Sequence, residues 1–320
     1  MKSSNTWFEF FINQLIRISG YSAIVFVLMI FFFLLREGLP TLTEVPLRSL
    51  FSVRWYPIED LFGILPLIGG SIVVTIGAGL VAIPFGVGTA IFIAEIAPRW
   101  AREILKPLIE VLAGIPSVVL GFLGFIVLAS LFRRLFNLPT GLSAFTGSLL
   151  LGAISIPTIV SVAEDALDAV PRAYRDSALA MGATEWQTIW MVTLPAARSG
   201  VLTAIMLGIG RAIGETMTVL LVTGNAPTLP TGLSALFRPI RTMTATIAAE
   251  MGEVAGGSTH YHVLFFIGIT LFIISLAINI TASAVVFRQR RRAESVPTLA
   301  CLSFAGCRQT SQAGSDRALL

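Results

Sequence analysis

Apolar residues in this sequence are gathered into six long runs. The runs cover residues 18–35, 66–94, 108–132, 142–163, 199–223 and 263–287. Each run is long enough for a helix to cross the hydrocarbon core of a bilayer, which takes about 20 residues. The pattern therefore predicts an all-α integral membrane protein with six transmembrane helices.

Charged residues are almost excluded from these runs. The runs contain 144 of the 320 residues, so even spreading would place 18 of the 40 charged residues there. Only three occur, Glu110, Arg211 and Glu215, and Glu110 lies close enough to an end of its run to reach the interface. The whole chain is 12% charged, against about 25% for soluble domains. This distribution excludes a soluble enzyme, a secreted disulfide scaffold and a disordered chain.

The basic residues favour a cytoplasmic N-terminus. With that orientation the inside segments hold twelve Lys and Arg residues and the outside loops hold seven, as the positive-inside rule requires. The Arg cluster at 288–292, just after the last run, contributes most to this bias. The net charge of +4 is thus explained by membrane topology rather than by nucleic-acid binding.

The parts outside the runs divide the chain further. We expect residues 1–17 to be cytoplasmic, 18–292 to form the membrane domain and 293–320 to be a disordered tail. The two cysteines, Cys301 and Cys307, both lie in this tail and are too few for a disulfide framework or a four-ligand metal site. His260 and His262 have no third ligand close by, so we predict no metal and no cofactor.

The segment between the fourth and fifth runs, 171–200, predicts two short helices. Pro171 can open the first helix, and Gly182 is the usual residue for a left-handed C-terminal cap. Thr184 and Gln187 have the spacing of a capping box at the start of the second helix. The dipeptide Leu194-Pro195 is expected to end that helix before the fifth run. By local pattern alone, a hairpin resting on lipid headgroups is the alternative interpretation.

The same segment resembles the coupling loop of ABC-importer permeases, whose motif reads Glu-Ala-Ala, three residues, Gly, nine residues, Ile, one residue, Leu-Pro. The spacing is kept by Asp176, Ser177, Ala178, Gly182, Val192, Leu194 and Pro195. Asp, Ser and Val replace the Glu, the first Ala and the Ile of the motif. The resemblance implies a helix that docks in a groove of an ATPase subunit. The sequence has no G-x-x-x-x-G-K-[ST] phosphate loop, so we expect ATP hydrolysis on a separate chain and no enzyme activity here.

Two opposite charges lie deep in the fifth run. A charge near the bilayer midplane costs about 2.5–3.5 kcal/mol on insertion scales. Arg211 and Glu215 are four residues apart, so on one helix face they can neutralise each other. In the functional interpretation, Arg211 attracts an anion and Glu215 keeps the anion from binding too tightly. Thr216 and Thr218 would add hydroxyl donors to that path.

Over about residues 15–292 the chain resembles the permease subunits of bacterial phosphate-specific ABC importers, and of the two paired types it is closer to the C-type. The segments that carry this resemblance are FGILPLIGGSIVVTIGAGLVAIPFGVGTAIFIAEIAP, GIGRAIGETMTVLLVTGN and RTMTATIAAEMGEVAGGSTHY. The resemblance implies the six-helix, MetI-like permease architecture of type I ABC importers in the inner membrane. It also implies a heterodimer with a second permease, two ATPase subunits and an extracytoplasmic phosphate-binding protein. Residues 293–320 depart from the family pattern.

Three alternatives remain open at this point. A permease of the same architecture for molybdate or sulfate would show the same charged pair. An ion-coupled secondary transporter would carry internal repeats and work without an ATPase, and the coupling-type loop argues against it. An intramembrane enzyme is disfavoured because the six runs contain no His, Cys or Asp.

Overall fold

The computed structural model describes residues 6–294; residues 295–320, most of the predicted tail with both cysteines, lie outside the described part. Six helical segments are long and apolar enough to cross a membrane, as the sequence predicts. They are Phe10–Glu44, Leu65–Ile96, Ser117–Leu135, Ala144–Asp168, Glu185–Gly214 and Thr259–Thr281. The described part is mostly helical, with irregular connections and two strands of two residues each, β1 (Trp55–Tyr56) and β2 (Leu61–Phe62).

The chain forms two compact units, and four of its long helices contribute to both. The first unit comprises residues 6–81, 115–154 and 211–275, and the second comprises 82–114, 155–210 and 276–294. The four shared helices are α4 (Leu65–Ile91), α8 (Ala144–Asp168), α11 (Leu194–Gly214) and α14 (Thr259–Glu294).

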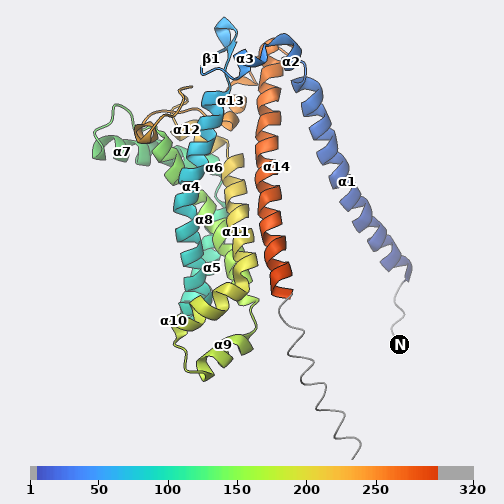
Figure 1. The fold of residues 1–320 in the computed structure, drawn as a ribbon, viewed down its shortest axis with the longest axis vertical. Helices are drawn as coiled ribbons and strands as arrows, with labels where there is room; N and C mark the ends of the chain where they lie inside the picture. Colours follow the sequence, from blue (N-terminus) through green and yellow to red (C-terminus); the bar gives the residue numbers. More distant parts are fainter. Residues whose placement is uncertain (1–5, 295–320) are drawn as a thin grey trace, which may run out of the picture. The chain divides into compact units, whose positions relative to one another are not determined.

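The first unit holds the N-terminal helix and the irregular segments between spans. Its further elements are α1 (Thr6–Gly38), α2 (Thr41–Glu44), α3 (Leu47–Leu50), η1 (Pro57–Glu59), α6 (Ser117–Leu123), η3 (Gly124–Leu128), α7 (Ala129–Leu135), α12 (Met217–Val222), η5 (Leu233–Phe237) and α13 (Met243–Glu250). The strands, α3 and α13 gather at one end of this unit (Figure 1).

One carboxylate ties this end of the first unit together. Glu250, the last residue of α13, accepts a hydrogen bond of 3.2 Å from the indole Nε1 of Trp55. Arg241 Nη2 lies 2.7 Å from the same oxygen, and His260 Nε2 lies 2.9 Å from the other carboxylate oxygen. The hairpin, α13 and the start of α14 are thus joined through one side chain.

The second unit contains the segment between the fourth and fifth spans. Its further elements are η2 (Phe92–Ile96), α5 (Arg99–Gly114), α9 (Arg172–Ala180), α10 (Glu185–Thr188) and η4 (Ile189–Thr193). Its core is apolar and includes Ile93, Ile159, Leu167, Ile189 and Val201, all buried.

The third span differs from the prediction of one helix over 108–132. Helix α5 ends at Gly114, and a new helix begins at Ser117. Pro116 lacks a backbone N–H and disfavours helical geometry at the residue before it, which accounts for the break. Pro84 and Pro157 lie inside unbroken helices, so of these three prolines only Pro116 interrupts its helix.

The prediction for the fifth span is wrong at both ends. Helix α10 continues through the π-helix η4 into α11, so Leu194-Pro195 does not end it. Pro195 is tolerated because it lies in the first turn of α11, directly after the wider turns of η4. At the other end α11 stops at Gly214, and Glu215 and Thr216 are not helical. The expected unbroken helix carrying both Arg211 and Glu215 is therefore not formed.

Candidate functional site

The loop between spans four and five has the two-helix form that the sequence predicts (Figure 1). Gly182 adopts a left-handed φ of +86°, and the N–H of Ala183 donates 3.1 Å to Ala178 O, closing the end of α9. The next helix opens with a complete capping box. The N–H of Thr184 donates 2.9 Å to Gln187 Oε1, and the N–H of Gln187 donates 3.2 Å to Thr184 Oγ1. These caps fix the direction of both helices.

The motif residues of this loop lie partly at its surface. Asp176, Ser177, Gly182 and Pro195 are exposed, and Ala178, Val192 and Leu194 are half-buried. Large apolar side chains share this surface: Tyr174, Leu179, Met181, Trp186 and Trp190 are all exposed, Met181 to 89%. Trp186 and Trp190 stack edge to face with centroids 5.8 Å apart. Exposed apolar groups next to an acidic residue are typical of a surface that binds another protein.

Arg175 attaches this loop to the rest of the second unit, and the sequence analysis missed it. Its Nη2 lies 2.6 Å from Oε1 of Glu95, and its Nε lies 3.1 Å from Oε2 of the same carboxylate. Its remaining donors reach the carbonyl oxygens of Val170 at 2.8 Å and Leu167 at 2.9 Å. The signal available in the sequence was Glu95, an isolated acid directly after the second apolar run.

Two further basic side chains of α5 bind the same region. Arg102 donates 2.8 Å to Ile93 O and also contacts Ala94 O. Lys106 lies 3.4 Å from Glu164 and 3.7 Å from Asp165. Burial lowers the pKa of the Lys106 ammonium, but the carboxylates of Glu164 and Asp165, with Asp168 beyond them, outweigh burial and raise that pKa above its ordinary value. Lys106 is thus fully charged at neutral pH.

The second predicted site, around Arg211, is built on the break in the fifth span. Arg211 lies in the last turn of α11 and is half-buried. Glu215 follows the helix end, and its Oε1 accepts 3.3 Å from the N–H of Thr218 in the first turn of α12. A carboxylate at a helix start satisfies a free N–H and complements the helix dipole. Glu215 therefore caps α12.

Hydroxyl groups join this break to neighbouring segments of the first unit. The fully buried Thr218 donates 3.1 Å to Ser117 O, at the start of α6. Thr244 of α13 donates 3.1 Å to Glu215 O, and Thr216 donates 3.3 Å to Gly214 O. The interrupted third span and the interrupted fifth span are thus connected directly.

The two histidines do not converge. His260 pairs with Glu250, whereas His262 Nδ1 lies 2.9 Å from Glu44 Oε1. Among residues 6–294 as described, no group of three His, Cys, Asp or Glu side chains is placed to hold a metal ion.

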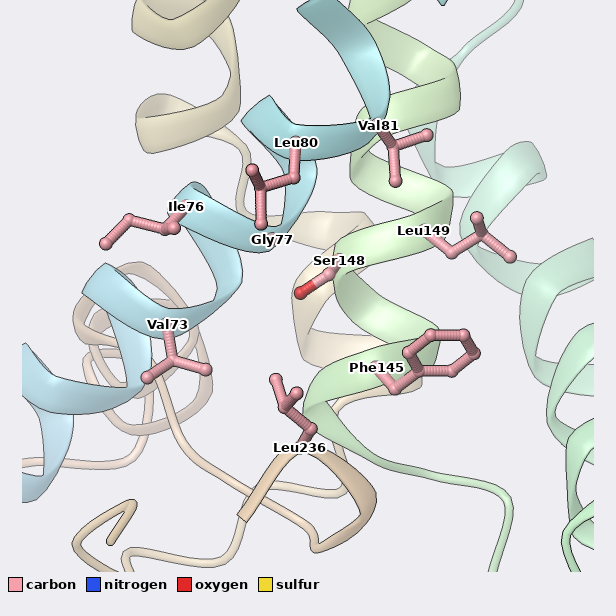
Figure 2. Close-up of a pocket in the computed structure, with 9 residues that line it drawn as sticks. All are labelled: Val73, Ile76, Gly77, Leu80, Val81, Phe145, Ser148, Leu149 and Leu236. Atoms are coloured by element: carbon pink, nitrogen blue, oxygen red, sulfur yellow. The ribbon is translucent and has the colours of Figure 1, made fainter. Parts of the chain in front are cut away.

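A cavity of about 410 Å³ lies between α4 and α8 in the first unit (Figure 2). Its lining includes Val73, Leu80 and Phe145, and its one polar lining side chain is Ser148. Ser148 Oγ is buried without a partner and lies against Gly77, where an added Cβ would approach it to 2.4 Å. A wall with no cation and a single hydroxyl cannot replace the hydration of an oxyanion, so we do not assign the anion to this cavity.

Comparison with known proteins agrees with this architecture. The model of the family "Binding-protein-dependent transport system inner membrane component" matches residues 82–293. The bacterial alginate ABC transporter, solved in complex with an alginate pentasaccharide-bound periplasmic protein, has a chain of the same fold. Its TM-score is 0.59 at 15% identity, covering 89% of this chain and 98% of that one. The MetNI methionine ABC transporter gives a TM-score of 0.53 at 18% identity, over 74% of this chain and 99% of its own.

Sequence relatives are closer. The probable ABC transporter permease protein YqgH of Bacillus subtilis is 40% identical over 72% of this chain and 74% of its own length. The phosphate transport system permease protein PstC of Mesorhizobium japonicum is 36% identical over 74% and 77%, and that of Haemophilus influenzae 31% over 90% and 96%.

Fold and relatives together define a multi-pass inner-membrane permease, and the relatives named here are transport permeases. The chain belongs to the family of binding-protein-dependent transport system inner membrane components.

Proposed function

We propose that this chain is a permease subunit of an ATP-driven importer of inorganic phosphate. The observation that carries the proposal is the similarity to phosphate transport system permease proteins, at 31% identity over 90% of this chain in the Haemophilus influenzae protein. The same relatives extend through the Arg211 and Glu215 region and through the loop 171–195. Phosphate, like other oxyanions, has the charge and the oxygen acceptors that suit an arginine fork.

Arg211 is the residue we assign to the anion path. A half-buried guanidinium at the end of a membrane helix supplies positive potential to an anion that passes it. Glu215 and Thr218 support it by fixing the helix break, because the carboxylate caps α12 and the Thr218 hydroxyl donates to Ser117 O. Thr216, half-buried at the break, is the hydroxyl we assign to the path beside Arg211.

The other subunits of the importer are assigned from two features of this chain, its missing phosphate-binding loop and the exposed surface of α9. Without a phosphate-binding loop for ATP, hydrolysis is assigned to two separate ATPase subunits. The exposed face of α9 with Asp176, Leu179 and Met181 is the surface we assign to the ATPase. A second, homologous permease completes the path, and an extracytoplasmic phosphate-binding protein delivers the substrate.

The proposed orientation places both termini and the loop 171–195 in the cytoplasm, in accord with the basic residues. The membrane domain then covers 18–292, with residues 1–17 inside. The hairpin of β1 and β2 and helix α13 face outward, toward the binding protein.

A permease for another oxyanion, molybdate or sulfate, is the second candidate, because the same Arg211 would serve it. The test is to express the chain with a tag in a phosphate-importer-deficient bacterium, together with its neighbouring transport genes. Radiolabelled phosphate uptake and co-purification of an ATPase support the proposal. Uptake of sulfate or molybdate without phosphate would transfer it to the second candidate.

A further inference from the structure

The ion pair between Glu95 and Arg175 joins α9 to a segment that lies 80 residues earlier in the sequence. We propose that this pair is the mechanical link through which the loop 171–195 moves the ends of α4 and α8 during transport. Both residues are then positioning residues, since neither touches the transported anion. The inference rests on the proposed function, in which that loop binds an ATPase.

The geometry is that of a clamp rather than a surface contact. The guanidinium of Arg175 faces the carboxylate of Glu95 through both Nε and Nη2, at 3.1 Å and 2.6 Å. The two side chains are only 19% and 8% exposed. A bidentate pair shielded from water holds its geometry better than an exposed one, because two parallel bonds resist both displacement and rotation.

The clamp has a second attachment on α8. Arg175 donates to Leu167 O, inside the last turn of α8, and to Val170 O just beyond it. One side chain of α9 therefore holds the end of the second span, through Glu95, and the end of the fourth span at once. Of the described side chains of α9, Arg175 alone forms hydrogen bonds or ion pairs with another element.

The link continues into α5. Arg102 donates to Ile93 O, and its guanidinium also contacts Ala94 O, so α5 grips the same short π-helix η2 that carries Glu95. Asp168 lies 3.6 Å from Arg102 and brings the end of α8 to the same point. A displacement of α9 is thus transmitted to α4, α5 and α8 through charged and backbone contacts that are all made within the second unit.

Lysine cannot replace arginine in this arrangement. An ammonium is a compact point charge and cannot bind two carboxylate oxygens and two carbonyl groups in a fixed plane. Arg175→Lys keeps the charge and removes the fork. Glu95→Gln keeps the shape and one acceptor, and removes the charge.

The experiment measures transport per ATP hydrolysed. The full importer, with its ATPase and binding protein, is reconstituted in liposomes for the wild type, Arg175→Lys, Glu95→Gln and the control Lys106→Gln. Lys106 joins α5 to Glu164 of α8 and touches no residue of the loop. The ratio is taken for whichever anion the wild type imports, so a wrong substrate assignment does not affect the result.

We expect both clamp variants to co-purify with the ATPase and to hydrolyse ATP at close to the wild-type rate. Their uptake per ATP should fall about tenfold, whereas Lys106→Gln should keep the wild-type ratio. An unchanged ratio in both clamp variants would overturn the proposal. So would loss of the ATPase from both, because the clamp is assigned to transmission and not to assembly.

A second measurement applies if the substitutions disturb the structure of the membrane domain. Cysteines replace Glu95 and Arg175 in a chain with Cys301→Ser and Cys307→Ser, and a bifunctional thiol reagent bridges them. Bridging should restore uptake per ATP relative to the same protein treated with a monofunctional reagent. Equal ratios with the two reagents would contradict a mechanical role.

Discussion

The hydroxyl of Thr218 donates a hydrogen bond of 3.1 Å to the backbone carbonyl of Ser117, 101 residues earlier in the chain. It connects two membrane segments at the points where each is broken, after Ile115-Pro116 and after Gly214. The bond fixes the start of α12 against the start of α6.

The first prediction concerns this bond. Thr218→Val keeps the side-chain shape and removes this hydrogen bond, which should cost about 0.5–1.5 kcal/mol of stability. Thermal unfolding of the purified protein in detergent measures the change. Thr218→Ser retains the hydroxyl and should lie much closer to the wild type. Equal melting temperatures for the Val and wild-type proteins would show that the bond contributes nothing.

The second prediction separates the two charges of the fifth span. Arg211→Gln should reduce phosphate uptake by about tenfold or more, because one charged donor to an anion in a low-dielectric site contributes at least about 1.5 kcal/mol. Expression and ATPase co-purification should be unchanged. Arg211→Lys should retain part of the uptake, since it keeps the charge without the fork. Full uptake with Gln would return Arg211 to a purely structural role.

The third prediction tests the cap of α9. A Cβ at position 182 meets no neighbour, but the left-handed φ of +86° strains any residue with a side chain by about 1–2 kcal/mol. Gly182→Val should therefore weaken co-purification of the ATPase, whereas Gly182→Asn, a residue that tolerates this conformation, should do so less. Gly20→Val, at an open position of α1, is the matched control. Identical ATPase recovery with all three proteins would show that the C-terminal cap of α9 does not affect binding of the ATPase.

The fourth prediction concerns the carboxylate that joins the hairpin to α13. Glu250→Ala leaves Arg241, His260 and Trp55 without their shared acceptor and should cost about 3 kcal/mol. Glu44→Ala removes a more exposed acceptor from His262 and should cost less than about 1 kcal/mol. The difference is measured as the separation of the two melting temperatures. If the melting temperature of the Glu44 variant is equal to or below that of the Glu250 variant, the contacts of Glu250 are not a major stabilising element.

Local sequence signals predicted most of what is local. The six spans, the capping box at Thr184 and Gln187, and the left-handed Gly182 all depend on neighbouring residues and on composition. The helix interruptions are harder to predict from the sequence. Pro84, Pro116 and Pro157 look alike in sequence, and of these three only Pro116 ends a helix. No proline marks the helix end at Gly214. Hydrogen bonds from the hydroxyls of Thr218 and Thr244 lie beside it, and their acceptors, Ser117 O and Glu215 O, could not be predicted from local sequence.

Ion pairs between residues far apart in the sequence could not be predicted either. Glu95 and Arg175 are 80 residues apart, and nothing in either local pattern specifies the other. Helical spacing predicts Arg211 and Glu215 on one continuous helix, whereas α11 ends at Gly214 and the Glu215 carboxylate accepts from the N–H of Thr218 in α12. Pro195 was expected to break a helix because the π-helix before it was not foreseen.

Competition between anions shows whether phosphate is the anion that this importer carries. Uptake of radiolabelled phosphate at micromolar concentration is measured in cells that depend on this chain, with excess unlabelled phosphate, sulfate or molybdate. We predict that phosphate abolishes the signal and that sulfate and molybdate leave it unchanged. Suppression by sulfate or molybdate, or phosphate uptake that does not require the chain, would contradict the account.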